Sequence, residues 1–151
     1  MNRVAERVGI SLLVLIAIAT ASCSRPSRTA QCEQIEEANN TAQASSMNVY
    51  NSAIGQTMDV PEFEQKLAQV RATAAQDIAA LEISDQKLSK LRDRLANAYQ
   101  QASDISGQLV TILPSDGRLA PSLENRVQQL RLEAEEDIPP TLHELTLYCI
   151  S

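Results

Sequence analysis

The chain has 151 residues and a net charge of −6, with one Phe and no Trp. This length suits a single domain. Its many Ala, Leu, Gln and Glu residues favour helix over strand, because their side chains lose little rotamer freedom in a helix. The acidic balance and the scattered basic residues exclude nucleic acid from the expected partners, since phosphate backbones would be repelled.

The first 22 residues have the pattern of a secretory signal peptide. Arg3 and Arg7 precede an uncharged apolar run of about 14 residues, whereas a helix that spans a membrane needs about 20. A permanent transmembrane anchor is therefore the weaker interpretation. Removing Arg3, Arg7 and Glu6 with the signal leaves 11 of the 13 basic and 18 of the 19 acidic residues, a net charge of −7.

The signal ends in the sequence Thr20-Ala21-Ser22-Cys23. These residues resemble the bacterial lipoprotein signal, or lipobox, apart from Thr20, which stands where Leu is commonest. The resemblance implies that Cys23 is diacylated and attaches the chain to the exported face of a membrane, periplasmic or thylakoid-lumenal. The alternative is ordinary cleavage after Ala21, because Ala19-Thr20-Ala21 is also a small-x-small site. That product would be a soluble exported helical protein.

The three cysteines, Cys23, Cys32 and Cys149, bear on this choice. Export delivers the chain to an oxidising compartment, where an odd thiol is a liability. If Cys23 carries lipid, Cys32 and Cys149 can pair with each other. If Cys23 carries none, one thiol is left over, so the cysteine count favours lipidation.

Residues 23–30 are expected to form a lipid anchor and tether, and residues 31–151 a helical bundle domain. Pro26 and Ser27 disfavour helix in the tether. Two interpretations of Arg25 and Arg28 stay open: they contact anionic lipid head groups, or they belong to a solvated linker.

Four helical segments are predicted in the domain. The first, from Ala30 to about Ile54, has a weak apolar stripe that Ser45 interrupts. The second begins at Pro61 behind the expected cap Asp59. Its apolar side chains recur at steps of three and four residues: Phe63, Leu67, Val70, Ala74, Ile78 and Leu81.

The third segment, capped by Ser84 and Asp85, has the strongest periodicity. Its seam follows an unbroken heptad pattern: Leu88, Leu91, Leu95, Ala98, Ala102, Ile105, Leu109 and Ile112. The fourth segment begins at Pro121 or Ser122. We expect it to be kinked or split at Pro139-Pro140, because proline supplies no backbone N–H, and to resume over Thr141–Cys149.

Four amphipathic segments with short connections predict an all-α, up-and-down four-helix bundle. In this topology the first helix begins at the end of the bundle where the last helix ends. Cys32 and Cys149 occupy these two places, so we expect a disulfide between them. A cross-link closing a loop of this size stabilises a fold by about 4–5 kcal/mol in the chain-entropy model.

Three short stretches of the chain resemble small cyanobacterial helical lipoproteins of unknown function. They are Cys32 with Ile35, residues 80–88, and Leu147-Tyr148-Cys149. The resemblance implies a helical domain with paired cysteines and brings no known activity.

Catalytic chemistry finds little support in the sequence. His143 is the only histidine, and a general base beside Glu144 or near Cys149 is the weaker interpretation, because no partner cluster surrounds it. A di-iron site in a bundle needs two histidines. The acidic run over residues 133–137 points around a helix and cannot converge on a cation. We expect no catalytic residue, no cofactor and no metal site.

The sequence therefore predicts a non-enzymatic binding or accessory module, held on a membrane by lipid on Cys23 and docked on a protein partner there. The alternative is a carrier of a small ligand or metal in a pocket between the helices.

Overall fold

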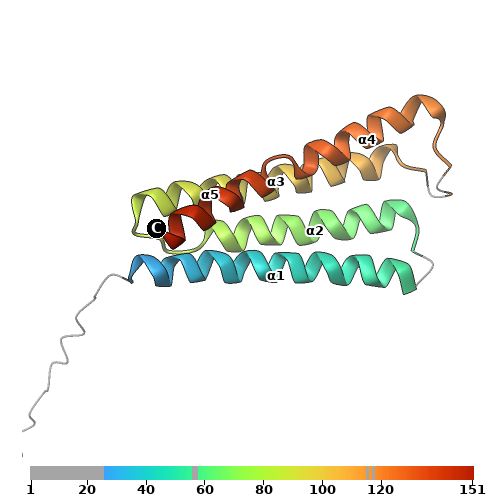
Figure 1. The fold of residues 1–151 in the computed structure, drawn as a ribbon. Coiled ribbons are helices and arrows are strands. Elements are labelled where there is room, and N and C mark those ends of the chain that lie inside the picture. Colours follow the sequence, from blue (N-terminus) through green and yellow to red (C-terminus); the bar gives the residue numbers. More distant parts are fainter. Residues whose placement is uncertain (1–25, 56–57, 115, 117) are drawn as a thin grey trace, which may run out of the picture.

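The computed structural model describes residues 26–55, 58–114, 116 and 118–151. The predicted signal peptide and Cys23, the predicted site of lipidation, lie outside these residues. The described residues form five helices and no strand: α1 (Arg28–Gly55), α2 (Val60–Ala79), α3 (Gln86–Ile112), α4 (Pro121–Glu135) and α5 (Ile138–Ile150). Figure 1 shows three rods, α1 to α3, beside a fourth that α4 and α5 form in succession. The predicted all-α bundle is confirmed.

The helix starts follow local capping chemistry. The Asp59 side chain accepts a hydrogen bond from the Glu62 backbone N–H at 2.7 Å, and the Asp85 side chain accepts from Lys87 and Leu88 at 2.9 Å each. Asp59 and Asp85 are therefore confirmed as caps, whereas Ser84, predicted to cap α3 with Asp85, donates to the Gln31 side chain instead. At the end of α3, Leu113 adopts an extended conformation just before Pro114, as expected for a residue that precedes proline.

The first helix begins earlier than predicted. Ser27, expected in the tether, accepts a hydrogen bond at its Oγ from the Ala30 backbone N–H at 3.1 Å, and α1 begins at Arg28. Serine disfavours a helix interior but satisfies a free N–H at a helix start. The segment between Cys23 and the first helix is thus shorter than the sequence suggested.

The last rod is split, as predicted, but the break lies ahead of the proline pair. Helix α4 ends at Glu135 and α5 begins at Ile138, so Pro139 and Pro140 occupy the first turn of α5. Backbone N–H groups in the first turn have no partner within their helix, and proline is tolerated there. The prolines therefore start α5 instead of interrupting it, and α5 continues roughly in the direction of α4 (Figure 1).

The bundle has two ends with different packing. We call the end that holds the start of α1, the α2–α3 turn and the end of α5 the disulfide end. The opposite end, with the α1–α2 and α3–α4 connections, is the cleft end (Figure 1). Toward the disulfide end, α1, α2, α3 and α5 share one core, made of Cys32, Ile35, Ala42, Ala74, Ala75, Ile78, Leu88, Leu91, Leu95, Ala96, Tyr99 and Leu145.

Toward the cleft end, the buried core belongs to α3 and α4, with Leu113 just beyond α3: Ala102, Ile105, Leu109, Leu113, Val127, Leu130 and Ala134. Helix α3 packs against each of the other helices, whereas α4 packs chiefly on α3. In α1, every residue of which is described, none beyond Ala42 is buried. Burial of α1 is thus confined to the half nearer the disulfide end.

Candidate functional site

The disulfide end is held by a covalent cross-link. Cys32 in α1 and Cys149 in α5 form a disulfide with a Cα–Cα distance of 6.0 Å, although 117 residues separate them in sequence. This distance is ordinary for disulfides. The predicted pairing is confirmed, and it ties the two terminal helices of the bundle together.

A buried glutamine supports the same end. The Gln31 side chain accepts hydrogen bonds at Oε1 from the backbone N–H groups of Ser84 (2.7 Å) and Asp85 (2.9 Å), and its Nε2 donates to the Pro26 carbonyl at 2.7 Å. It is almost fully buried. One side chain thus joins α1, the α2–α3 turn and the segment before α1. Sequence reasoning missed this role, because nothing local distinguishes Gln31 from the other glutamines.

Asp85 connects the start of α3 to α5 at the disulfide end. In addition to capping α3, its carboxylate accepts a hydrogen bond from the Tyr148 hydroxyl at 3.1 Å. The Leu88 backbone N–H, helped by Tyr148, holds the pKa of the Asp85 carboxyl below its ordinary value. The three stretches on which the sequence resemblance rests therefore meet at the disulfide end. They are Cys32, residues 80–88 and Leu147-Tyr148-Cys149.

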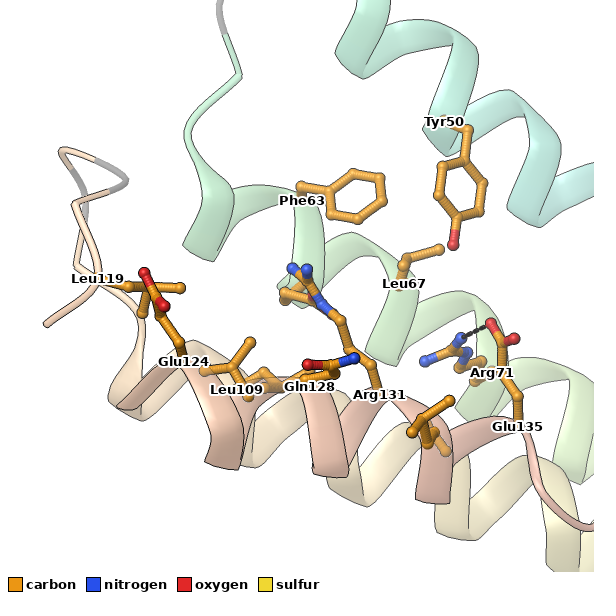
Figure 2. A pocket seen from close by; sticks show the side chains of 14 residues that line it. Tyr50, Phe63, Leu67, Arg71, Leu109, Leu119, Glu124, Gln128, Arg131 and Glu135 are labelled. Carbon is orange, nitrogen blue, oxygen red and sulfur yellow. Dashed lines mark hydrogen bonds and ion pairs between the residues drawn. The ribbon is translucent and has the colours of Figure 1, made fainter. Parts of the chain in front are cut away.

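The cleft end carries an open cavity of about 490 Å³. Its walls come from α2 and α4, with contributions from α1 and α3 (Figure 2). The apolar lining comprises Tyr50, Phe63, Leu67, Leu109, Leu119, Val127, Leu132 and Ala134, and the polar lining Glu64, Arg71, Glu124, Gln128, Arg131 and Glu135. We refer to this cavity as the α2–α4 cleft.

Two ion pairs bridge the α2–α4 cleft. The cation belongs to α4 in one pair and to α2 in the other. Arg131 of α4 donates to Glu64 of α2 at 3.1 Å, and Arg71 of α2 lies 3.7 Å from Glu135 of α4. Figure 2 shows the Arg131 side chain extending from α4 toward α2 and the Arg71–Glu135 pair as a dashed line. In each pair the α2 member is buried or nearly so, and the α4 member is exposed.

The two α2 charges differ in how they are held. The Arg71 guanidinium donates to the Ser106 hydroxyl at 2.6 Å and to the Ala102 carbonyl, both in α3. Glu64 is only 3% exposed, yet the cation that reaches it, Arg131, is 52% exposed. A buried carboxylate whose counter-ion lies half in water is a group that another cation can approach.

Aromatic and aliphatic side chains surround the mouth of the cleft. Tyr50 of α1 and Phe63 of α2 meet edge to face, with ring centroids 5.1 Å apart (Figure 2). Tyr50 and Leu132 of the lining are exposed, and Met47 and Ile54 are exposed on the same helix as Tyr50. Exposed apolar side chains therefore lie beside the charged residues of the cleft.

The residues considered for catalysis are dispersed. His143 is exposed on α5, and Cys149 is held in the disulfide. In the acidic run, Glu135 pairs with Arg71, whereas Glu133 accepts a hydrogen bond from Gln129. Across residues 26–55, 58–114, 116 and 118–151, no three His, Cys, Asp or Glu side chains lie close enough together to hold a metal ion.

Tyr99 has a structural role in the middle of the bundle. It is buried and donates a hydrogen bond to the Asn39 side chain at 2.9 Å. Burial raises the pKa of the Tyr99 phenol, which keeps the proton that it donates. Asn39, one of the asparagines that weaken the helix propensity of α1, thus connects α1 to α3.

Comparison with known proteins adds no assignment to this geometry. The chain matches no protein-family model, no curated protein and no solved structure. None of the helices in the described part of the chain combines the length and apolar character needed to cross a bilayer.

Proposed function

We propose that this protein is a non-enzymatic lipoprotein whose α2–α4 cleft binds an amphipathic segment of a partner protein at a membrane surface. The lipid on Cys23 holds it on the exported face, periplasmic or thylakoid-lumenal. The observation that carries the proposal is the cleft itself, a cavity lined by apolar and charged side chains that include the exposed Leu132. Contiguous exposed apolar surface commonly marks an interaction site.

A helical segment suits the shape of the site. Helix α4 has 15 residues and is therefore about 22 Å long, which matches a partner helix of three to four turns. Such a segment would place its apolar face on Tyr50, Phe63 and Leu132, in the manner of helices that bind in grooves.

The charges favour a partner segment that is basic. A lysine or arginine of the partner can replace Arg131 at Glu64, and little is lost when Arg131 returns to water, because its pair is half exposed. The net charge of the chain without its signal, −7, attracts a basic partner over a longer distance. The displaced Arg131 remains available for an acidic group of the same segment.

The proposed anchor leaves the cleft accessible. Tyr50, at the cleft, follows Arg28 by 22 residues and thus lies about 33 Å further along α1. The five residues from Cys23 to Arg28 span at most about 18 Å. Lipid would hold the disulfide end near the membrane while the cleft stands at the opposite end of the molecule.

The first experiment is isolation of the native protein from membranes, followed by intact mass measurement with and without reductant. A mass that begins at Cys23 with added acyl groups supports the anchor, and a lipid-free mass that begins at Ser22 overturns it. A gain of two hydrogens on reduction tests the Cys32–Cys149 disulfide in the same sample.

Partner binding is tested by affinity purification from mildly solubilised membranes. We expect a stoichiometric partner that is lost in Leu132→Arg, which removes an apolar contact and places a cation in the cleft that repels a basic segment. Asn125→Arg is the matched control, because Asn125 is exposed on the same helix and is not part of the cleft lining. Equal recovery of a partner by both variants, or recovery of the protein alone in every detergent, would contradict the proposal.

One observation favours the carrier of a small ligand as the second candidate. The cleft volume of about 490 Å³ lies within the range of about 300–1,000 Å³ that is typical of ligand pockets. A ligand that binds only the folded protein raises its melting temperature. A metabolite that stabilises the wild type and not Leu132→Arg would support this candidate over the protein partner.

A further inference from the structure

We infer that the disulfide end of the bundle is a membrane-seating surface, which lies in the interface of a phospholipid bilayer and orients the molecule. This inference rests on the proposed lipid at Cys23. It concerns a surface at the opposite end from the cleft, formed by Arg28, Lys87, Leu147, Tyr148 and Ile150. We call these five residues the seating surface.

The length of the connecting chain places this end at the bilayer. Pro26 follows Cys23 by three residues, and such a segment spans at most about 11 Å. Pro26 is itself fixed to the bundle, because its carbonyl accepts the hydrogen bond from the buried Gln31 side chain. Acyl chains on Cys23 would therefore hold the first turn of α1 within reach of the head groups.

Three of the five residues lie beside one another, and the other two belong to the last turns of the same helix as Tyr148. The Arg28 guanidinium carbon is 5.3 Å from the centre of the Tyr148 ring, and the Lys87 Nζ is 4.6 Å from it. The first turns of α1 and α3 therefore lie beside the last turn of α5. The disulfide between Cys32 and Cys149 fixes this arrangement.

The composition of the seating surface suits a bilayer interface. Leu147 and Ile150 are one turn apart on α5, and they are 52% and 78% exposed. Apolar side chains at this depth gain by entering the boundary between head groups and acyl chains. Tyrosine is enriched at membrane interfaces, and lysine and arginine can reach phosphate groups from the same level.

The charge at this end is balanced rather than strongly basic. Glu82 and Asp85 belong to the turn between α2 and α3, which lies at the same end as the starts of α1 and α3 that hold Arg28 and Lys87. The Asp85 carboxylate accepts from Tyr148 and from two backbone N–H groups. The attraction to the bilayer therefore comes from the apolar side chains Leu147 and Ile150 and from Tyr148. Anionic lipid is not needed, so vesicles of zwitterionic phosphatidylcholine can serve as the test membrane.

Tryptophan fluorescence can test the orientation, because the chain has no native Trp. The native lipidated protein would carry Ile150→Trp at the seating surface or Ile54→Trp at the cleft end. Ile54 is the matched control, since it is an isoleucine near the end of a helix and is 85% exposed. Each variant is reconstituted into vesicles of phosphatidylcholine, with and without brominated acyl chains, which quench nearby indoles.

We expect the indole emission of the Ile150→Trp variant to shift to shorter wavelength on reconstitution and to be quenched by the brominated lipid. The Ile54→Trp variant should keep the emission wavelength and the intensity that it has in water. Leu147→Trp should show the same shift and quenching as Ile150→Trp, which would show that the result does not depend on one substituted position. Equal quenching at both ends, or no quenching at either, would overturn the inference.

Flotation of the vesicles and intact mass separate this failure from failure of the anchor. A protein that carries acyl groups and floats with vesicles, yet shows no difference between the two ends, refutes the seating surface alone. A protein without acyl groups that does not float refutes the proposed anchor and the seating surface together.

Discussion

The two ends of the bundle differ in how firmly their helices are held together. At the disulfide end, four helices share one core, and a disulfide and a buried glutamine join segments distant in sequence. At the cleft end, the core belongs to α3 and α4, and two ion pairs connect α4 to α2 across a cavity. An unfilled cavity gives up packing energy, so a domain with an open cleft needs compensation elsewhere. The contrast shows how a small domain can keep a cleft open.

The largest effect should come from breaking the cross-link of the disulfide end. Replacing Cys32 and Cys149 together by Ser should lower the free energy of unfolding by about 4–5 kcal/mol, because the unfolded chain gains the freedom of a long loop. Urea unfolding of the variant, with reduced wild type as the control, measures this loss.

Hydrogen exchange of the same variant tests whether the two ends behave separately. Protection should fall first in α5 and the start of α1, while the α3–α4 core keeps its protection. Uniform loss along all helices would show that the two ends unfold as one unit.

The second largest effect should follow Gln31→Ala. This change leaves the Ser84 and Asp85 N–H groups and the Pro26 carbonyl without their partner, and the expected loss of stability is about 2–3 kcal/mol. Chemical denaturation measures it. In Gln31→Glu a carboxylate oxygen still accepts from both N–H groups, so this variant should lose less stability than Gln31→Ala. A negligible effect of both variants would mean that water replaces the side chain.

A smaller effect should come from opening the cleft. Arg131→Ala leaves the Glu64 carboxylate without its counter-ion, and we expect a loss of about 1–2 kcal/mol, reduced by the exposure of Arg131. Lys66→Ala is the control, because its pair with Glu62 is exposed and joins neighbouring turns of one helix. Equal losses in the two variants would show that burial of Glu64 adds nothing.

The smallest effect should be a pH dependence at the disulfide end. The folded-state pKa of Asp85 lies below its ordinary value of about 3.9, so its charged form stabilises the fold above that pH. This contribution should fade as the pH falls through the folded-state pKa. Asp85→Asn keeps an oxygen for capping and removes the titration. The stability difference between wild type and variant should shrink in acid, and a constant difference would contradict this account.

Local signals in the sequence predicted most of the helix bounds. These signals depend only on neighbours within a few residues. They are the caps Asp59 and Asp85, a proline in the first turn of α2 and of α4, and the heptad seam of α3. The first helix was placed two residues late, because Ser27 was assigned to the tether rather than to a cap. The proline pair was recognised as a boundary, although its position within the first turn of α5 depends on where the preceding helix ends.

The pairing of Cys32 with Cys149 followed from the sequence because helix order and short connections leave few ways to arrange four rods. The sequence by itself thus determined the class of fold, the order of the helices and the cross-link. The tertiary structure alone decided where the bundle is open. The cleft arises because α4 packs on α3 and diverges from α2, and its charges meet across long separations, as Glu64 and Arg131 do. Gln31 and the Arg28–Tyr148–Lys87 group are likewise assembled from distant segments. Helical periodicity specifies which side of a helix is buried, whereas the angle between two helices depends on how both sets of side chains interlock.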